Sequence, residues 1–107
     1  MRVGILTALM AVALAFSFLL NSEQNTEGEK IYAGKCAGCH AKDGSGSTAR
    51  GKTLKVPDLR SSEIQQKTDA ELIEGILKAK GHPPYEKQLG DEGLRNVVLF
   101  MRTFKSK

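Results

Sequence analysis

The stretch CAGCH, Cys36 to His40, decides how the rest of this 107-residue chain is interpreted. It places two thiols three positions apart and a histidine directly after the second thiol. The next 19 residues, AKDGSGSTARGKTLKVPDL, are rich in glycine and serine and should not hold regular structure for long. Such a long irregular run is unusual in a small domain unless it wraps a bound group. The pattern therefore predicts a ligand-binding site at this point.

C-x-x-C-H is the attachment signature of a c-type haem. Thiols at this spacing at a helix end can reach the two vinyl groups on one porphyrin edge, and the adjacent imidazole can then point at the iron. We therefore expect one haem c, attached covalently through Cys36 and Cys39, with His40 as an iron ligand. A Cys36–Cys39 disulfide is one alternative in an oxidising compartment. A zinc half-site is another, although only His82 could supply a further ligand.

The N-terminal residues 1–22 have the pattern of a targeting segment. One arginine precedes an apolar run of 18 residues, Val3 to Leu20, which is typical of a secretory signal peptide. The same run is just long enough to span a bilayer, so an uncleaved membrane anchor is the alternative. Either interpretation predicts that residues 23–107 form one domain in the periplasm or otherwise outside the cytoplasmic membrane.

The composition limits the functions open to this domain. A chain of about 85 residues buries a modest core and usually needs a cofactor or another staple. Aromatic residues are scarce, with four Phe, two Tyr and no Trp, so a buried cofactor would supply missing core. The formal net charge of +4 is mildly basic, and the sequence has no nucleic-acid motif. We expect protein redox partners, with acidic docking surfaces, and no nucleic acid.

Apolar periodicity and helix caps predict an all-α fold with three main helices and a short one. The predicted helical segments are 27–37, 62–66, 69–80 and 91–104. Capping boxes at Thr26-x-x-Glu29 and Thr68-x-x-Glu71 predict the starts of the first and third segments. Gly81 predicts the end of the third. No segment alternates as a strand would, which also argues against a thioredoxin-like use of the two cysteines.

Over residues 26–105 the chain resembles a class I c-type cytochrome of the small bacterial monohaem kind. The shared features, in chain order, are a helix ending in C-x-x-C-H, a loop containing PDL, a middle helix, a ligand loop and an amphipathic last helix. The resemblance implies the cytochrome c fold, wrapped around a covalently bound haem. It also implies an electron carrier rather than an enzyme.

The resemblance assigns two residues to the crossing of the first and last helices. Gly28 and Tyr32 would lie there, near Leu99 and Phe100, because glycine permits close backbone approach.

Three further residues are implied to bind or support the haem. The carbonyl of Pro57 would accept a hydrogen bond from the ring N–H of His40, which fixes the tautomer of that ligand. Leu59 would pack on the haem face, and Tyr85 matches the aromatic residue of the family's ligand loop.

The distal ligand departs from the family pattern. In KGHPPY, Lys80 to Tyr85, His82 stands where the family places its methionine ligand. Two of the three methionines lie in the targeting segment, and we expect Met101 to be a core side chain of the last helix. We therefore expect His40 and His82 to ligate the iron together, with a reduction potential below that of a Met-ligated relative. A solvated His82 beside an open distal site is the alternative.

An open distal site would change the function. The protein would then be a haem-based gas sensor, or a peroxidase-like enzyme with His82 as an acid–base group. An electron carrier, by contrast, would use the lysines around the haem edge to steer acidic partners. The lysines expected in this ring are Lys30, Lys35, Lys42, Lys78, Lys80 and Lys87. An ordinary solvated surface is the other interpretation of these lysines.

Overall fold

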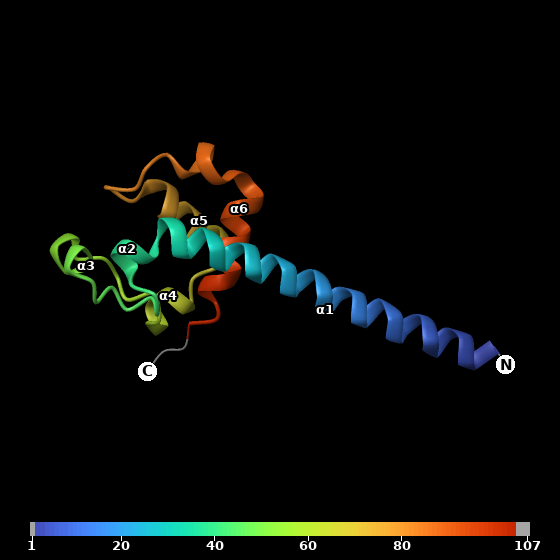
Figure 1. The fold of residues 1–107 in the computed structure, drawn as a ribbon. Coiled ribbons are helices and arrows are strands. Elements are labelled where there is room, and N and C mark those ends of the chain that lie inside the picture. Colours follow the sequence, from blue (N-terminus) through green and yellow to red (C-terminus); the bar gives the residue numbers. More distant parts are fainter. Residues whose placement is uncertain (1, 105–107) are drawn as a thin grey trace.

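The computed structural model describes residues 2–104, except for the side chains of 2–8, 20 and 21. Within that range it is helical and contains no strand, which confirms the all-α prediction (Figure 1). The helices are α1 (Arg2–Lys35), α2 (Ala37–His40), α3 (Ala49–Leu54), α4 (Ser62–Gln65), α5 (Asp69–Lys78) and α6 (Tyr85–Met101). Three are long and three are short, so two short helices were not predicted.

Helix α1 is continuous across the segment where the start of the first helix was predicted. Thr26 does not cap a helix, because its hydroxyl donates to the carbonyl of Ser22 one turn earlier. The prediction of a start at Glu27 was therefore wrong. Between Gly4 and Gly28 there is neither proline nor glycine, so nothing in the backbone chemistry stops the helix.

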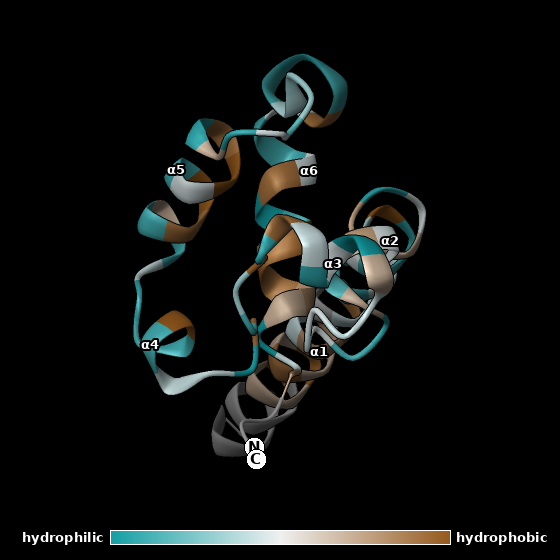
Figure 2. Cartoon of the chain, turned by 90° about the vertical axis from the view of Figure 1, so that its left-hand side faces the viewer, coloured by the Kyte–Doolittle hydropathy of each residue, from teal (hydrophilic) through white to brown (hydrophobic). Residues whose placement is uncertain are grey.

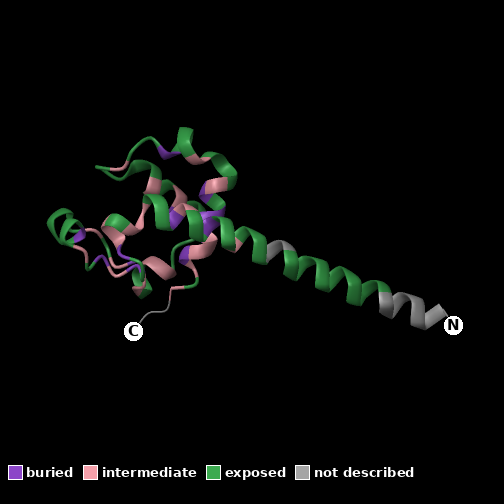
Figure 3. Cartoon of the chain, viewed as in Figure 1, coloured by how far each residue is buried: buried purple, intermediate pink, exposed green. Residues whose placement is uncertain are grey.

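The N-terminal part of α1 projects away from the rest of the chain (Figures 1 and 3). Its large apolar side chains are exposed, at 62–78% for the seven residues Leu9, Met10, Val12, Leu14, Phe16, Phe18 and Leu19. None of the helices, within the part of the chain that the structure describes, is long and apolar enough to cross a membrane.

The core forms where α1 crosses α6, and Figure 3 shows buried residues there as well as in the loops around α3 and α4. A Cβ added to Gly28 would lie 2.0 Å from the carbonyl oxygen of Asn96, so only glycine fits this crossing. The Tyr32 ring packs against Phe100 and Phe104, with centroids 5.4 and 5.1 Å apart. The buried core cluster comprises Tyr32, Leu59, Leu72, Val97, Val98 and Met101. The expected crossing is confirmed, with Asn96 rather than Leu99 opposite the glycine.

Helices α5 and α6 turn their apolar faces toward the centre of the molecule (Figure 2). Thr68 and Glu71 form the predicted capping box at the start of α5. The helix ends at Lys78, two residues earlier than predicted, and Gly81 lies beyond it with φ of +90°. A non-helical Gly90, with φ of +64°, interrupts α6 just before the predicted start of the last helix.

The glycine-rich segment after CAGCH was predicted to be irregular, but it contains helix α3. The hydroxyl of Thr48 accepts from the N–H of Gly51 and donates to the carbonyl of Cys39. Gly51 lies against that same carbonyl, since a Cβ there would be 2.2 Å from the oxygen. Helix α3 is therefore held directly on the backbone of the cysteine motif.

Candidate functional site

The two cysteines lie at the junction of α1 and α2. Both are half-buried and neither forms a disulfide in the structure. Burial raises the pKa of the Cys36 thiol to about 11, against the opposing charge of Lys35. The neutral thiol is a poor zinc ligand, because metals bind the thiolate. The described residues also contain no cluster of three or more His, Cys, Asp or Glu side chains that could hold a metal ion.

The two histidines, which lie 42 positions apart in sequence, face one another. Their ring centroids are 6.1 Å apart and the ring planes are inclined at 70°. Imidazole nitrogens bind metal ions at about 2 Å, so two rings on opposite sides of one ion have centroids about 6 Å apart. The spacing of His40 and His82 therefore fits one metal ion between them.

Hydrogen bonding differs between the two rings. Nδ1 of His82 donates to the carbonyl of Ile76, 2.7 Å away, at the end of α5. A carbonyl only accepts, so this bond places a proton on Nδ1, and Nε2 is the nitrogen of the neutral ring that could bind a metal ion. Nδ1 of His40 is buried and has no hydrogen-bond partner.

The environment of His40 favours a neutral ring. Burial lowers its pKa, the charge of His82 lowers it further, and the carbonyl of Pro57 acts in the opposite direction. Pro57 thus lies near the ring, and its carbonyl acts on the pKa as a hydrogen-bond acceptor, although Nδ1 has no partner that meets full hydrogen-bond geometry. The hydrogen bond that the family resemblance implied stays a prediction. Neutral imidazole is the form that binds metals, so the environment suits a ligand.

The other predicted site residues lie around the histidines. Leu59 is in the core cluster, and so is Met101, as expected for a packing side chain. Tyr85 is buried, its hydroxyl donates to the carbonyl of Lys35, and its ring centroid is 5.3 Å from that of His82. Burial raises the pKa of the Tyr85 hydroxyl, so it remains a donor at neutral pH.

Two groups at the site were not predicted from the sequence. They are the backbone carbonyls of Ile76 and Lys35, which accept from His82 and Tyr85. Every residue carries such a carbonyl, so no residue type marks these two. Only their position at the ends of α5 and α1 offers a signal, because carbonyls in the last helical turn lack an intrahelical partner.

Comparisons with known proteins agree with this site. The family model described as cytochrome c oxidase, cbb3-type, subunit III matches residues 23–101, a span that holds both the cysteine motif and His82. The chain belongs to this family. It is a small class I c-type cytochrome. A "Cytochrome c6-like" protein of Nostoc sp. (strain PCC 7120) is 28% identical over 102 residues, covering 87% of this chain and 88% of that protein. No solved structure gives a significant match.

Membership of this family implies a covalently bound haem c and electron transfer with redox partners. The residues of the cytochrome fit such a haem in two respects. Two free thiols lie at one helix end, and two imidazoles face each other at a spacing suited to one metal ion.

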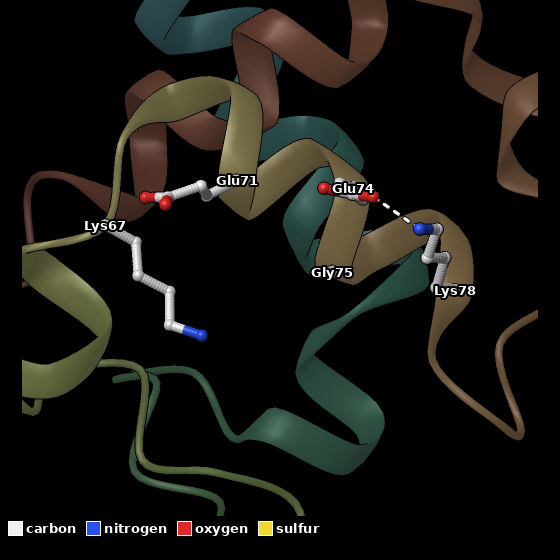
Figure 4. A pocket seen from close by; sticks show the side chains of 5 residues that line it. All are labelled: Lys67, Glu71, Glu74, Gly75 and Lys78. Atoms are coloured by element: carbon white, nitrogen blue, oxygen red, sulfur yellow. Dashed lines mark hydrogen bonds and ion pairs between the residues drawn. The ribbon is translucent and has the colours of Figure 1, made fainter.

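A surface hollow lies along α5. It is lined by Lys67, Glu71, Glu74, Gly75 and Lys78, and Figure 4 shows the ion pair between Glu74 and Lys78. The lining residues are all exposed and none is a predicted haem residue.

Proposed function

We propose that this cytochrome is an exported electron carrier with one haem c, attached through Cys36 and Cys39 and ligated by His40 and His82. The facing imidazoles, 6.1 Å apart, carry this proposal. Haem, when bound, supplies a single iron that accepts and releases one electron. His40 and His82 would both hold that iron, which would leave no open position for a small molecule or a substrate.

Bis-histidine ligation would give the carrier a low potential. Imidazole supports ferric iron better than a thioether does, and Met/His ligation raises the potential. The hydrogen bond from His82 to the Ile76 carbonyl orients the ring and makes it a more basic ligand. Axial ligands and their surroundings move haem potentials over about 0.8 V, so the choice of His82 affects which partners can exchange electrons.

Absorption spectra of the oxidised, reduced and CO-treated reduced protein test this ligation. Low-spin bands, no band typical of methionine ligation and only weak CO binding are expected. In His82→Ala the reduced haem should bind CO, and in His82→Met the potential should rise. A wild-type protein that binds CO readily would refute the ligation and favour a gas-binding role. Turnover of peroxide would favour an enzyme.

The partners are proposed to be redox proteins with acidic surfaces. The predicted lysine ring is partly neutralised, since Lys30 pairs with Glu27 and Lys78 pairs with Glu74. Three exposed cations on and beside α3, however, have no ion-pair partner among the described residues: Arg50, Lys52 and Lys55. They lie close to the cysteine motif, because α3 packs on α2.

Charge steering predicts faster reduction of this cytochrome by dithionite, an anionic reagent strong enough for a low-potential haem, at low salt than at high salt. The triple variant Arg50→Glu, Lys52→Glu, Lys55→Glu should reverse this salt dependence. Rates that do not depend on ionic strength would contradict an electrostatic docking role.

Residues 1–22 are proposed to direct export, as a cleaved signal or a retained anchor. The exposed apolar side chains of Leu9 to Leu19 support this, because they find no packing partner in the domain. The mass of the purified mature protein distinguishes the two forms. A cytochrome that acquires covalent haem in the cytoplasm would contradict export.

A further inference from the structure

Tyr85 links the His82 loop to the end of α1. It is the first residue of α6 and lies three positions after His82. Its side chain is 7% exposed, and its hydroxyl donates to the Lys35 carbonyl over 3.1 Å. Because Cys36 follows Lys35 directly, this bond ties the distal loop to the segment that carries the haem-attachment motif.

The His82 ring is held by two different groups. The Ile76 carbonyl accepts from Nδ1 at 2.7 Å, and this contact belongs to α5. The Tyr85 ring approaches the imidazole edge-on, with centroids 5.3 Å apart and planes inclined at 62°. An edge-to-face contact of this kind is favourable and directional. The imidazole therefore has a fixed neighbour on each side.

The loop itself has few other contacts that could hold it. The backbone bonds from the N–H of His82 to Ala79 and from the N–H of Tyr85 to Pro83 are local. Apart from the Tyr85 bond, one hydrogen bond joins the start of α6 to the end of α1. It runs from Nζ of Lys35 to Gln88, both exposed. An exposed bond of this kind contributes little, so Tyr85 supplies the buried connection.

We propose that Tyr85 is a positioning residue that keeps His82 on the iron, by pinning its ring through the hydroxyl bond to Lys35. This inference rests on the proposed bis-histidine ligation. Loss of the hydroxyl frees the ring of Tyr85 to shift, and the loop then opens more often. His82 would leave the iron more readily, although His40 and the two cysteines would be unaffected.

CO binding to the reduced protein measures how often His82 leaves. CO competes for the distal position, so its apparent affinity is reduced by the fraction of molecules in which that position is open. Removing one neutral hydrogen bond changes such an equilibrium by about two- to tenfold. The apparent CO dissociation constant of Tyr85→Phe should therefore fall by about two- to tenfold.

The experiment compares full-length haem-loaded wild type with Tyr85→Phe, Tyr85→Leu and Tyr32→Phe, by CO titration and by the rate of CO binding after rapid mixing. Tyr32→Phe is the matched control, because it also removes a buried tyrosine hydroxyl bonded to a backbone carbonyl, that of Ala41. We expect faster and tighter CO binding in Tyr85→Phe, a larger effect in Tyr85→Leu, and wild-type behaviour in Tyr32→Phe.

Three results would overturn the inference, and they differ in what else they refute. Equal CO affinities of wild type and Tyr85→Phe would refute the role of Tyr85 and leave bis-histidine ligation intact. A change in CO affinity in Tyr32→Phe as large as that in Tyr85→Phe would do the same. Wild type that binds CO as readily as His82→Ala would refute the ligation itself, and the role of Tyr85 with it.

Discussion

Replacing Gly28 by alanine should force α1 and α6 apart. The added Cβ would lie 2.0 Å from the Asn96 carbonyl oxygen, 2.7 Å from its carbonyl carbon and 3.0 Å from Cβ of Phe100. The first two atoms belong to the backbone and cannot rotate away. The shortest favourable distance between a carbon and a carbonyl oxygen is about 3.3 Å, so the two helices must move apart by about 1.3 Å at the crossing.

The expected loss of stability is about 2 kcal/mol, the balance of two losses and one gain. Overpacking of this kind destabilises by about 1–3 kcal/mol. Widening the crossing also loosens the Tyr32–Phe100 ring pair, a contact type that contributes about 0.5–1.5 kcal/mol. Alanine returns about 1 kcal/mol through its higher helix propensity. In a domain of this size such a loss should lower the melting temperature by about 10 °C.

Urea unfolding of the haem-loaded protein, followed by circular dichroism at 222 nm, measures the effect. Gly34→Ala is the matched control in the same helix, because a Cβ there meets no atom within 4 Å. It should stabilise the protein by about 0.5–1 kcal/mol through helix propensity alone. Opposite signs for the two substitutions are expected. A Gly28→Ala protein as stable as Gly34→Ala would refute the close crossing.

Two further predictions concern α5 and the core. Hydrogen bonds from the backbone and side chain of Thr68 hold the pKa of Glu71 below its usual value of 4.5. The stabilisation they provide is present above pH 4.5 and is lost as the pH falls through the lower folded value, so Glu71→Gln should show a smaller drop in melting temperature on acidification. Equal drops would contradict the capping box. Met101→Leu should leave the haem spectrum unchanged and cost under about 1.5 kcal/mol, whereas a changed spectrum would mean that Met101 is a ligand.

The capping-box pattern Thr-x-x-Glu correctly predicted the start of α5 but wrongly predicted a helix start at Thr26. Thr68 and Glu71 form a capping box because Lys67, before them, lies outside a helix. Thr26 and Glu29 have the same spacing, but residues 21–25 before them are already helical, and the helix continues through. A capping box is a local competition between starting and continuing a helix. The outcome depends on the residues that lie upstream.

The haem-attachment motif was predictable because its residues are neighbours in the chain. His82 was predictable because it occupies the ligand position of a loop that otherwise resembles the family's. The groups that accept hydrogen bonds from His82 and Tyr85 could not be predicted from the sequence. The Ile76 and Lys35 carbonyls accept from His82 and Tyr85 across 6 and 50 positions, and a carbonyl has no residue-specific signature.

The sequence by itself determined the all-α class, the cysteine motif and the α5 cap, and it predicts a histidine ligand in place of methionine. Each of these features depends on residues that are close together in the chain, so covalent geometry and side-chain chemistry are enough to predict it. Tertiary structure alone decided that Gly28 lies directly against Asn96 of α6 and that His40 and His82 lie 6.1 Å apart. These distances join segments 68 and 42 positions apart. They arise from burial of one shared core, which no local pattern specifies.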